Sequence, residues 1–97
     1  KKKEITPQII KSTVAEYYSI PVESLLSERR DREIVLPRQV AMYLCHDMLG
    51  IPYKRISTLF DKNDHTTAIN ACKRVEEMIV NDSSFSSMIE DVKKRMG

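Results

Sequence analysis

Proline and glycine are few in this chain, and their positions divide it into helical segments. Proline occurs at positions 7, 21, 37 and 52 and does not recur over residues 53–97. It is favoured in the first turn of a helix, where its missing N–H would have no partner, and it stops a helix that reaches it. Glycine occurs only at Gly50 and Gly97. This pattern predicts an all-α fold with short connections.

Apolar residues at helical spacing place the helices before the first loop. Thr6 and Pro7 predict the N-cap and first turn of a helix that Pro21 ends. A short helix is expected next, over residues 22–26. Residues 27–36 carry many charges and no apolar period, which predicts a loop.

Two further helices are expected up to residue 60. Pro37 is predicted to open the first, which Gly50 ends in the left-handed conformation. Pro52 is predicted to open a shorter one over about residues 53–60. The sequence contains no stretch of alternating apolar and polar residues long enough for a strand, and no internal repeat. Both observations favour an all-α fold.

A turn at Asp61-Lys62-Asn63 separates this short helix from the next, since Asp and Asn hydrogen-bond to nearby backbone. Asp64 is a good N-cap for a helix that continues to about Val80. A second turn at residues 81–84 precedes a last helix over about residues 85–96. The total is about five or six helices.

The short helix, the turn and the long helix match the spacing of a helix-turn-helix. Ala68 and Ala71 are small, which lets the second helix approach the first closely. An ordinary helical hairpin in a small bundle fits the same spacing, so spacing alone leaves both interpretations open.

Length and composition indicate one small domain. The chain has 97 residues, of which 41% are hydrophobic and 31% charged, as in ordinary folded proteins. We place the domain at residues 6–97 and interpret residues 1–5 as the remnant of a linker from a longer parent. No apolar run is long enough to cross a membrane. Cys45 and Cys72 fall on apolar stripes, which is typical of buried thiols rather than of a disulfide scaffold or zinc ligands.

No catalytic or cofactor-binding pattern is found. A chain with so little glycine lacks a Gly-rich phosphate loop. Asp64, His65 and Thr66 are successive on a helix and do not face one another, so they do not form a nucleophilic set. We therefore expect no enzymatic activity, no metal and no cofactor.

Charge is segregated along the chain, although the formal net charge is only +2. Residues 29–38 hold four arginines, residues 53–74 hold five Lys or Arg, and residues 75–92 hold five acids and no Lys or Arg. Such a dipolar surface suits a protein that docks one face on a polyanion. Solvated helix faces with incidental clustering are the simpler alternative.

Arginine dominates the predicted loop, at positions 29, 30 and 32. Its planar, always-charged guanidinium suits phosphates and narrow minor grooves. Asp31 and Glu33 lie between these arginines and would, in the other interpretation, tie the loop down by ion pairs, although exposed pairs contribute little.

The long helix opens with Asp64, His65, Thr66 and Thr67, which in a helix-turn-helix point at base edges in the major groove. Asp can accept a hydrogen bond from cytosine N4, a Thr methyl can pack on a thymine methyl, and His can donate to purine acceptors. As an N-cap, Asp64 would instead accept from a backbone amide without any ligand, and the two roles are compatible.

Two strings make the chain resemble a known family. They are Arg29-Arg-Asp-Arg-Glu-Ile-Val-Leu-Pro-Arg-Gln-Val-Ala-Met-Tyr-Leu44 and Asp61-Lys-Asn-Asp-His-Thr-Thr-Ala-Ile69. In this order and spacing the chain is similar, from about residue 5 to residue 95, to the C-terminal DNA-binding domain of the bacterial chromosomal replication initiator DnaA. It departs from the family's usual Gly-Gly-Arg at residues 61–63.

The resemblance implies a helical domain in which a basic loop precedes a helix-turn-helix, and binding to duplex repeats of the TTATNCACA type (DnaA boxes) at a replication origin. It implies a minor-groove contact for Arg30, and major-groove base contacts for Asp64, His65, Thr66 and Thr67. It also implies phosphate contacts for Arg38 and Gln39. Charge adds further candidates for phosphate contacts: Arg29, Arg32, Lys54, Arg55, Lys62, Lys73 and Arg74.

The resemblance also implies a setting. The isolated domain is expected to be a monomer and the parent to self-associate on DNA, in the cytoplasm at the nucleoid, with acidic phospholipid as a further partner of the parent. ATP is implied only for a motor module of the parent that this sequence does not contain. The alternative of another class is a protein-interaction module whose basic face docks an acidic protein or acidic lipid.

Overall fold

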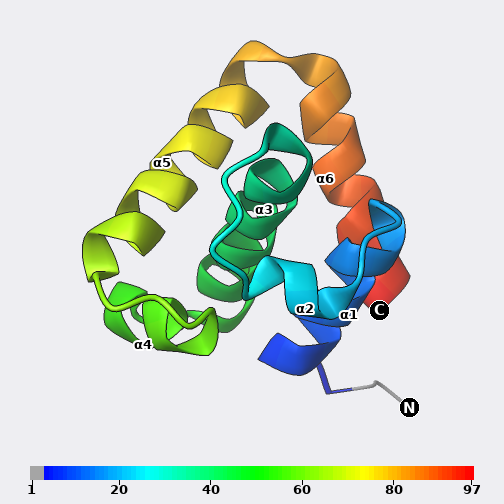
Figure 1. Cartoon of the computed structure of the whole chain (residues 1–97). Coiled ribbons are helices and arrows are strands. Elements are labelled where there is room, and N and C mark those ends of the chain that lie inside the picture. The colour runs from blue at the N-terminus through cyan, green and yellow to red at the C-terminus, as the bar shows by residue number, and fades with distance from the viewer. Residues whose placement is uncertain (1–3) are drawn as a thin grey trace.

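The computed structural model describes residues 4–97, which form six α-helices and no strand (Figure 1). α3 lies at the centre, α1, α2, α4 and α5 pack against it, and α6 packs on α1 and α5. The predicted all-α class is confirmed. The helices are α1 (Pro7–Tyr17), α2 (Val22–Leu25), α3 (Arg32–Leu49), α4 (Tyr53–Leu59), α5 (His65–Asn81) and α6 (Ser83–Met96).

The predicted linker remnant at residues 1–5 lies mostly outside the described residues. Of the two that are described, Glu4 is exposed and Ile5 packs, partly buried, against the core. The boundary between linker and domain therefore stays a prediction.

Capping residues fix three of the helix ends where the sequence predicts them. Thr6 Oγ1 accepts from the Ile9 amide at 3.2 Å and starts α1. Asp64 Oδ1 accepts from the Thr66 amide at 2.9 Å and starts α5. Gly50 ends α3 at φ 66°, a left-handed conformation that glycine adopts without steric cost.

The predicted start of α3 is wrong. The helix begins at Arg32, so Pro37 lies inside it rather than at its first turn. The amide that Pro37 lacks would bond to the carbonyl of Glu33, an exposed residue in the first turn, where water can take its place. Burial of Ile34, which is 2% exposed, favours the extra turn.

The predicted turn at residues 81–84 is also too long. Asp82 alone separates α5 from α6, with φ −142° and ψ 104°. Its Oδ1 accepts from the amides of Ser84 and Phe85 at 3.0 and 3.2 Å, so one capping side chain is enough to start the last helix.

The hydrophobic core surrounds α3. Its side chains on α3 meet apolar faces of the surrounding helices. Fully buried members include Ile10, Val14, Leu25, Val40, Ala41, Leu44, Cys45, Ile56, Phe60, Ala68 and Val75.

α4 and α5 form the predicted helix-turn-helix, joined by residues 60–64. They pack on each other, and Ala68 and Ala71 of α5 are both buried, as the close approach requires. Lys11 of α1 secures the end of α4, because its ammonium group donates to the Leu59 carbonyl at 2.6 Å. The helix-turn-helix is therefore bonded to the rest of the fold at the point where its turn begins.

Candidate nucleic-acid interface

The turn of the helix-turn-helix is braced by one buried side chain, Ser57 of α4, which is 2% exposed. Its hydroxyl donates to the Asp64 carbonyl at 3.0 Å, and its own carbonyl accepts from the Lys62 amide at 2.8 Å. Asp61 takes the left-handed conformation at φ 56°, which Asp tolerates better than most side chains. These contacts fix where α5 starts relative to α4.

The four predicted base-reading residues at the start of α5 are all exposed. The Thr66 amide bonds to Asp64 and holds the pKa of its carboxyl below the ordinary value, so Asp64 is ionised at neutral pH. That bond uses Oδ1 only. Asp64 is thus the expected N-cap, and Oδ2 remains for a second contact.

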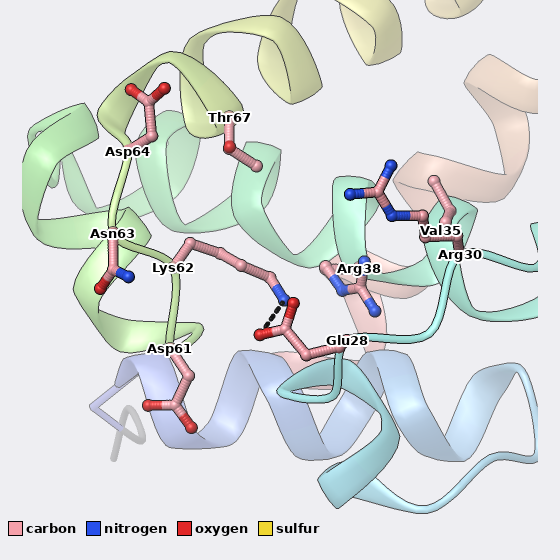
Figure 2. A pocket seen from close by; sticks show the side chains of 9 residues that line it. All are labelled: Glu28, Arg30, Val35, Arg38, Asp61, Lys62, Asn63, Asp64 and Thr67. Atoms are coloured by element: carbon pink, nitrogen blue, oxygen red, sulfur yellow. Dashed lines mark ion pairs between the residues drawn. The ribbon is translucent and has the colours of Figure 1, made fainter.

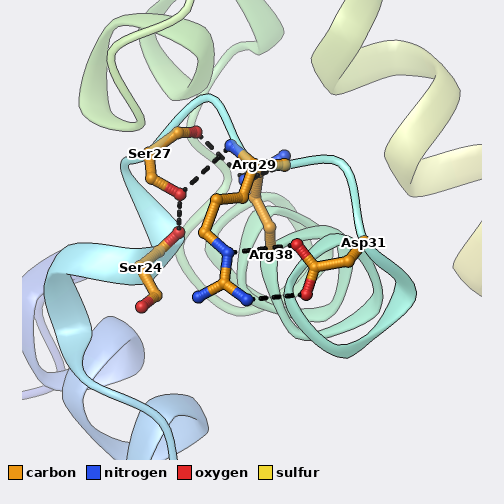
Figure 3. A network of polar contacts seen from close by, with 5 residues as sticks. All are labelled: Ser24, Ser27, Arg29, Asp31 and Arg38. Carbon is orange, nitrogen blue, oxygen red and sulfur yellow. Dashed lines mark hydrogen bonds and ion pairs between the residues drawn. The ribbon is translucent and has the colours of Figure 1, made fainter.

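The loop between α2 and α3 is anchored by Arg38, which is 8% exposed (Figure 3). The Arg38 guanidinium donates to the carbonyls of Leu25, Ser27 and Arg29 at 3.1, 3.0 and 2.8 Å. Burial lowers the pKa of Arg38, and nearby Glu28 and Asp31 oppose this shift. The loop backbone is therefore bonded to the middle of α3.

This geometry changes the interpretation of Arg38. The sequence predicts a phosphate contact, whereas in the structure Nε of Arg38 is bonded to a carbonyl at the end of α2 and Nη2 to two carbonyls of the loop. Its direct phosphate contact stays a prediction and would have to use Nη1. Sequence reasoning missed the structural role because the acceptors are backbone carbonyls, which carry no residue-type signal.

Two arginines of the loop differ in their surroundings. Arg29 forms a bidentate pair with Asp31, with Nε–Oδ1 at 3.1 Å and Nη2–Oδ2 at 2.8 Å (Figure 3). The Arg29 hydrogen bonds hold the pKa of the Asp31 carboxyl below its ordinary value. The ion pair with a loop arginine that the alternative interpretation expects for Asp31 is therefore present. Arg30, by contrast, is exposed.

A hollow of about 560 Å³ lies between the loop and the start of α5 (Figure 2). It brings together Arg30 and Glu28 from the loop, Arg38 and Val35 from α3, and residues 61–64 with Thr67 from the helix-turn-helix. We call this hollow the reading groove. Residues far apart in sequence thus meet on one face.

The other predicted phosphate contacts fall into two groups. A second hollow of about 290 Å³, which shares Arg30 with the reading groove, is lined by Arg32, Gln39 and Arg74. Lys54 and Arg55 are exposed on α4, and Lys73 lines a different hollow further along α5, beside Glu76 and Glu77. The structure therefore gathers Arg32, Gln39 and Arg74 at the second hollow and places Lys54, Arg55 and Lys73 elsewhere on the surface.

Lys62 and Glu28 show what sequence reasoning missed at the reading groove. Lys62 was expected to bind phosphate, but its Nζ donates to the Ser27 carbonyl at 2.7 Å and lies 3.9 Å from Glu28 Oε2 (Figure 2). Glu28 itself, 90% exposed at its side chain, was not predicted as a groove residue. No motif marks it, and only the fold of the loop brings it to Lys62.

The two cysteines are buried, as predicted. Burial raises the pKa of the Cys45 thiol to about 12 and that of Cys72 to about 11, so both stay protonated at neutral pH. Within residues 4–97, no three His, Cys, Asp or Glu side chains gather in a way that could hold a metal ion. Over the same residues, no helix has the length and apolar character needed to cross a membrane.

Known proteins resemble this chain along nearly its whole length. The sequence profile of the family described as bacterial dnaA protein helix-turn-helix matches residues 7–75. The chromosomal replication initiator protein DnaA of Citrifermentans bemidjiense is 36% identical and that of Geotalea uraniireducens 34% identical, each over 99% of this chain. The chain spans 21% of the length of each of these relatives. A solved structure, described as a DNA replication initiation factor, matches with a TM-score of 0.83 at 32% identity, over 93% of this chain and 27% of that one.

Proposed function

The chain belongs to the family of bacterial DnaA helix-turn-helix domains, and on that premise we propose that it binds duplex DNA sequence-specifically at DnaA boxes in the initiation of chromosome replication. In this proposal the first residues of α5 enter the major groove and Arg30 enters the neighbouring minor groove. The family membership supports DNA binding; the base-by-base roles are the finer proposal.

The observation that carries the proposal is the shared face of the loop and α5. Arg30 and Thr67 line the same groove, although 37 positions separate them in sequence, and the base-reading candidates beside Thr67 are exposed. A recognition helix with an arginine-bearing loop beside it can read both grooves of one duplex at once. Neither element alone would give that combination.

Phosphate contacts fit the cations that remain exposed around this face. We assign them first to the exposed cations Arg32 and Arg74, and to the neutral, half-buried Gln39 beside them, because all three line the hollow next to Arg30. Arg29, Lys54, Arg55 and Lys73 are exposed and extend the basic surface. Such contacts orient the protein on the duplex and make affinity salt-dependent without adding sequence information.

The wider setting of this activity is part of the same proposal. We propose that the domain binds DNA as a monomer, without a cofactor and without catalysis, in the cytoplasm at the nucleoid. Self-association on DNA, ATP binding and contact with acidic phospholipid are proposals for the longer protein that such a domain serves.

The test is a binding titration by fluorescence anisotropy, with one box duplex and one scrambled duplex of equal composition, at several salt concentrations. We expect tighter binding to the box and a steep fall of affinity with salt for both duplexes. Equal binding to box and scrambled duplex would contradict the proposal. Loss of binding to both, with binding to an acidic polypeptide or acidic lipid retained, would favour the protein-interaction alternative.

Three substitutions test the base-reading residues without removing the helix start. Asp64→Ser keeps an N-capping oxygen, and Thr66→Ser and Thr67→Ser each remove one methyl group. We expect each to narrow the gap between box and scrambled duplex, by roughly 5- to 100-fold at a well-made base contact. Melting temperatures within a few degrees of wild type are the control. Unchanged discrimination would mean that these residues only start the helix.

A further inference from the structure

Lys62 lies in the turn of the helix-turn-helix, but its side chain bonds to the loop between α2 and α3. Its Nζ donates to the Ser27 carbonyl at 2.7 Å, and the side chain is 13% exposed. Its backbone amide donates to Ser57 of α4. One residue therefore joins α4 to the loop across 35 positions of sequence.

The acceptor of this bond is shared. The Ser27 carbonyl also accepts from Arg38 Nη2 at 3.0 Å, so two cations from different elements converge on one oxygen. We call this arrangement the Ser27 clasp. Two positive groups on one acceptor repel each other, and the Glu28 carboxylate 3.9 Å from Lys62 offsets part of that repulsion.

We propose that Lys62 is a positioning residue for DNA recognition: through the Ser27 clasp it fixes the loop that carries Arg30 relative to the start of α5. The proposal rests on the proposed function, because it concerns how Arg30 and the first residues of α5 bind one duplex together. A loop already held in its binding position loses less conformational entropy when DNA binds than a free loop does. Lys62 then acts through Arg30 and not by binding a phosphate.

The surroundings of Lys62 fit this role better than a phosphate contact. A phosphate-binding lysine needs its ammonium group in solvent, whereas this one is largely covered and bonded to a carbonyl. Lys54 provides the contrast, since it is an exposed lysine on the same helix-turn-helix. It is the matched control.

The first experiment needs no DNA and tests the clasp alone. Lys62→Met keeps the length of the side chain but removes its donors, and an arginine-specific protease leaves the set of cleavage sites unchanged. We expect cleavage after residues 29, 30 and 32 to become several-fold faster in Lys62→Met than in wild type or Lys54→Met, because local opening governs such cleavage. Equal cleavage rates in all variants with equal melting temperatures would overturn the proposal.

The second experiment is a double-mutant cycle with Arg30→Ala on box and scrambled duplexes. We expect Lys62→Met to weaken box binding by roughly three- to thirtyfold, with little change for the scrambled duplex. In the Arg30→Ala background, Lys62→Met is expected to have no further effect on the ratio of the affinity for the box duplex to that for the scrambled duplex. The slope of log affinity against log salt should not change.

A direct phosphate contact gives the opposite results. Lys62→Met would then weaken both duplexes alike, in either background, and would reduce the magnitude of the salt slope by about 0.9. This outcome overturns the positioning role. If the wild-type protein binds box and scrambled duplexes equally, the proposed function fails, and so does the part of this inference that concerns DNA recognition. The protease rates still decide whether Lys62 holds the loop.

Discussion

The Ser57 hydroxyl donates to the Asp64 carbonyl at 3.0 Å, and this bond joins the first helix of the helix-turn-helix to the N-cap of the second. Ser57 is nearly inaccessible to solvent, whereas Asp64 is exposed. A buried side chain thus sets the position of a residue that faces outward. The stability of the helix-turn-helix and the placement of the residues proposed to contact bases are coupled through this bond.

Ser57→Ala is expected to lower the free energy of unfolding by about 0.5–1.5 kcal/mol, the usual net value of one hydrogen bond. Denaturation by urea, followed by circular dichroism, measures it. Thr58→Ala is the control, since Thr58 is exposed and its side-chain hydroxyl bonds within its own helix, to the Lys54 carbonyl. Equal effects of the two substitutions would contradict the bracing role of Ser57.

Arg38→Leu is expected to lower the free energy of unfolding by about 1.5–3 kcal/mol, because it removes the donor to the Leu25 and Arg29 carbonyls and one of the two donors to the Ser27 carbonyl. It should also lower the preference for the box, since the loop that carries Arg30 is released. A phosphate contact alone, which the family resemblance implies for Arg38, would instead weaken box and scrambled duplexes equally. Arg32→Ala, at an exposed position, should change stability by less than about 0.5 kcal/mol. A stable Arg38→Leu variant with an unchanged box preference would refute this view.

Arg30→Ala and Arg29→Ala are expected to separate two roles within one loop. Arg30 is exposed at the reading groove, so its loss should weaken box binding by about 1–3 kcal/mol. Arg29 is paired with Asp31, and its loss should weaken box and scrambled duplexes by similar, smaller amounts. Anisotropy titrations at one fixed salt concentration measure both. The reverse ranking would exchange the two assignments.

Acid should weaken the start of α5. The pKa of Asp64 is lowered in the folded state, so the ionised carboxylate stabilises the fold above its unfolded pKa of about 3.9. That contribution is lost as the pH falls through the lower folded pKa. Melting temperatures of wild type and Asp64→Ser should therefore keep a constant difference from pH 7 to about pH 5 and converge at lower pH. A difference that stays constant down to pH 2 would exclude a role for the charged cap.

The two buried thiols are expected to be unreactive in the native state. With the pKa of Cys45 raised to about 12 and that of Cys72 to about 11, almost no thiolate is present at pH 8. Alkylation by iodoacetamide, followed by mass spectrometry, should become fast only in denaturant.

A chelator should leave the helical circular-dichroism signal and the melting temperature unchanged. A chelator-induced loss of helix would show a metal requirement that the buried thiols do not suggest.

Local signals were sufficient for most helix ends. Thr6, Gly50 and Asp64 act through bonds to, or conformations of, their immediate neighbours, so their roles are written in short stretches of sequence. Pro37 shows the limit of this reasoning. Its local preference for a first turn is outweighed by packing of Ile34 one turn earlier, and packing depends on residues far away in the chain.

The sequence by itself determined the helical class and the string of residues that starts α5, because periodicity and capping act over a few residues. Spacing left the helix-turn-helix and a plain helical hairpin both open, and only the resemblance to a known family favoured the former. The sequence also identified the basic residues as a group. Only the tertiary structure decided how each of them is held: Lys62 and Arg38 are bonded to the Ser27 carbonyl, while Arg30 is exposed. The reason is that a backbone carbonyl is chemically the same in every residue, so the sequence does not show which cation will bond to it. The packing of distant segments determines that partner.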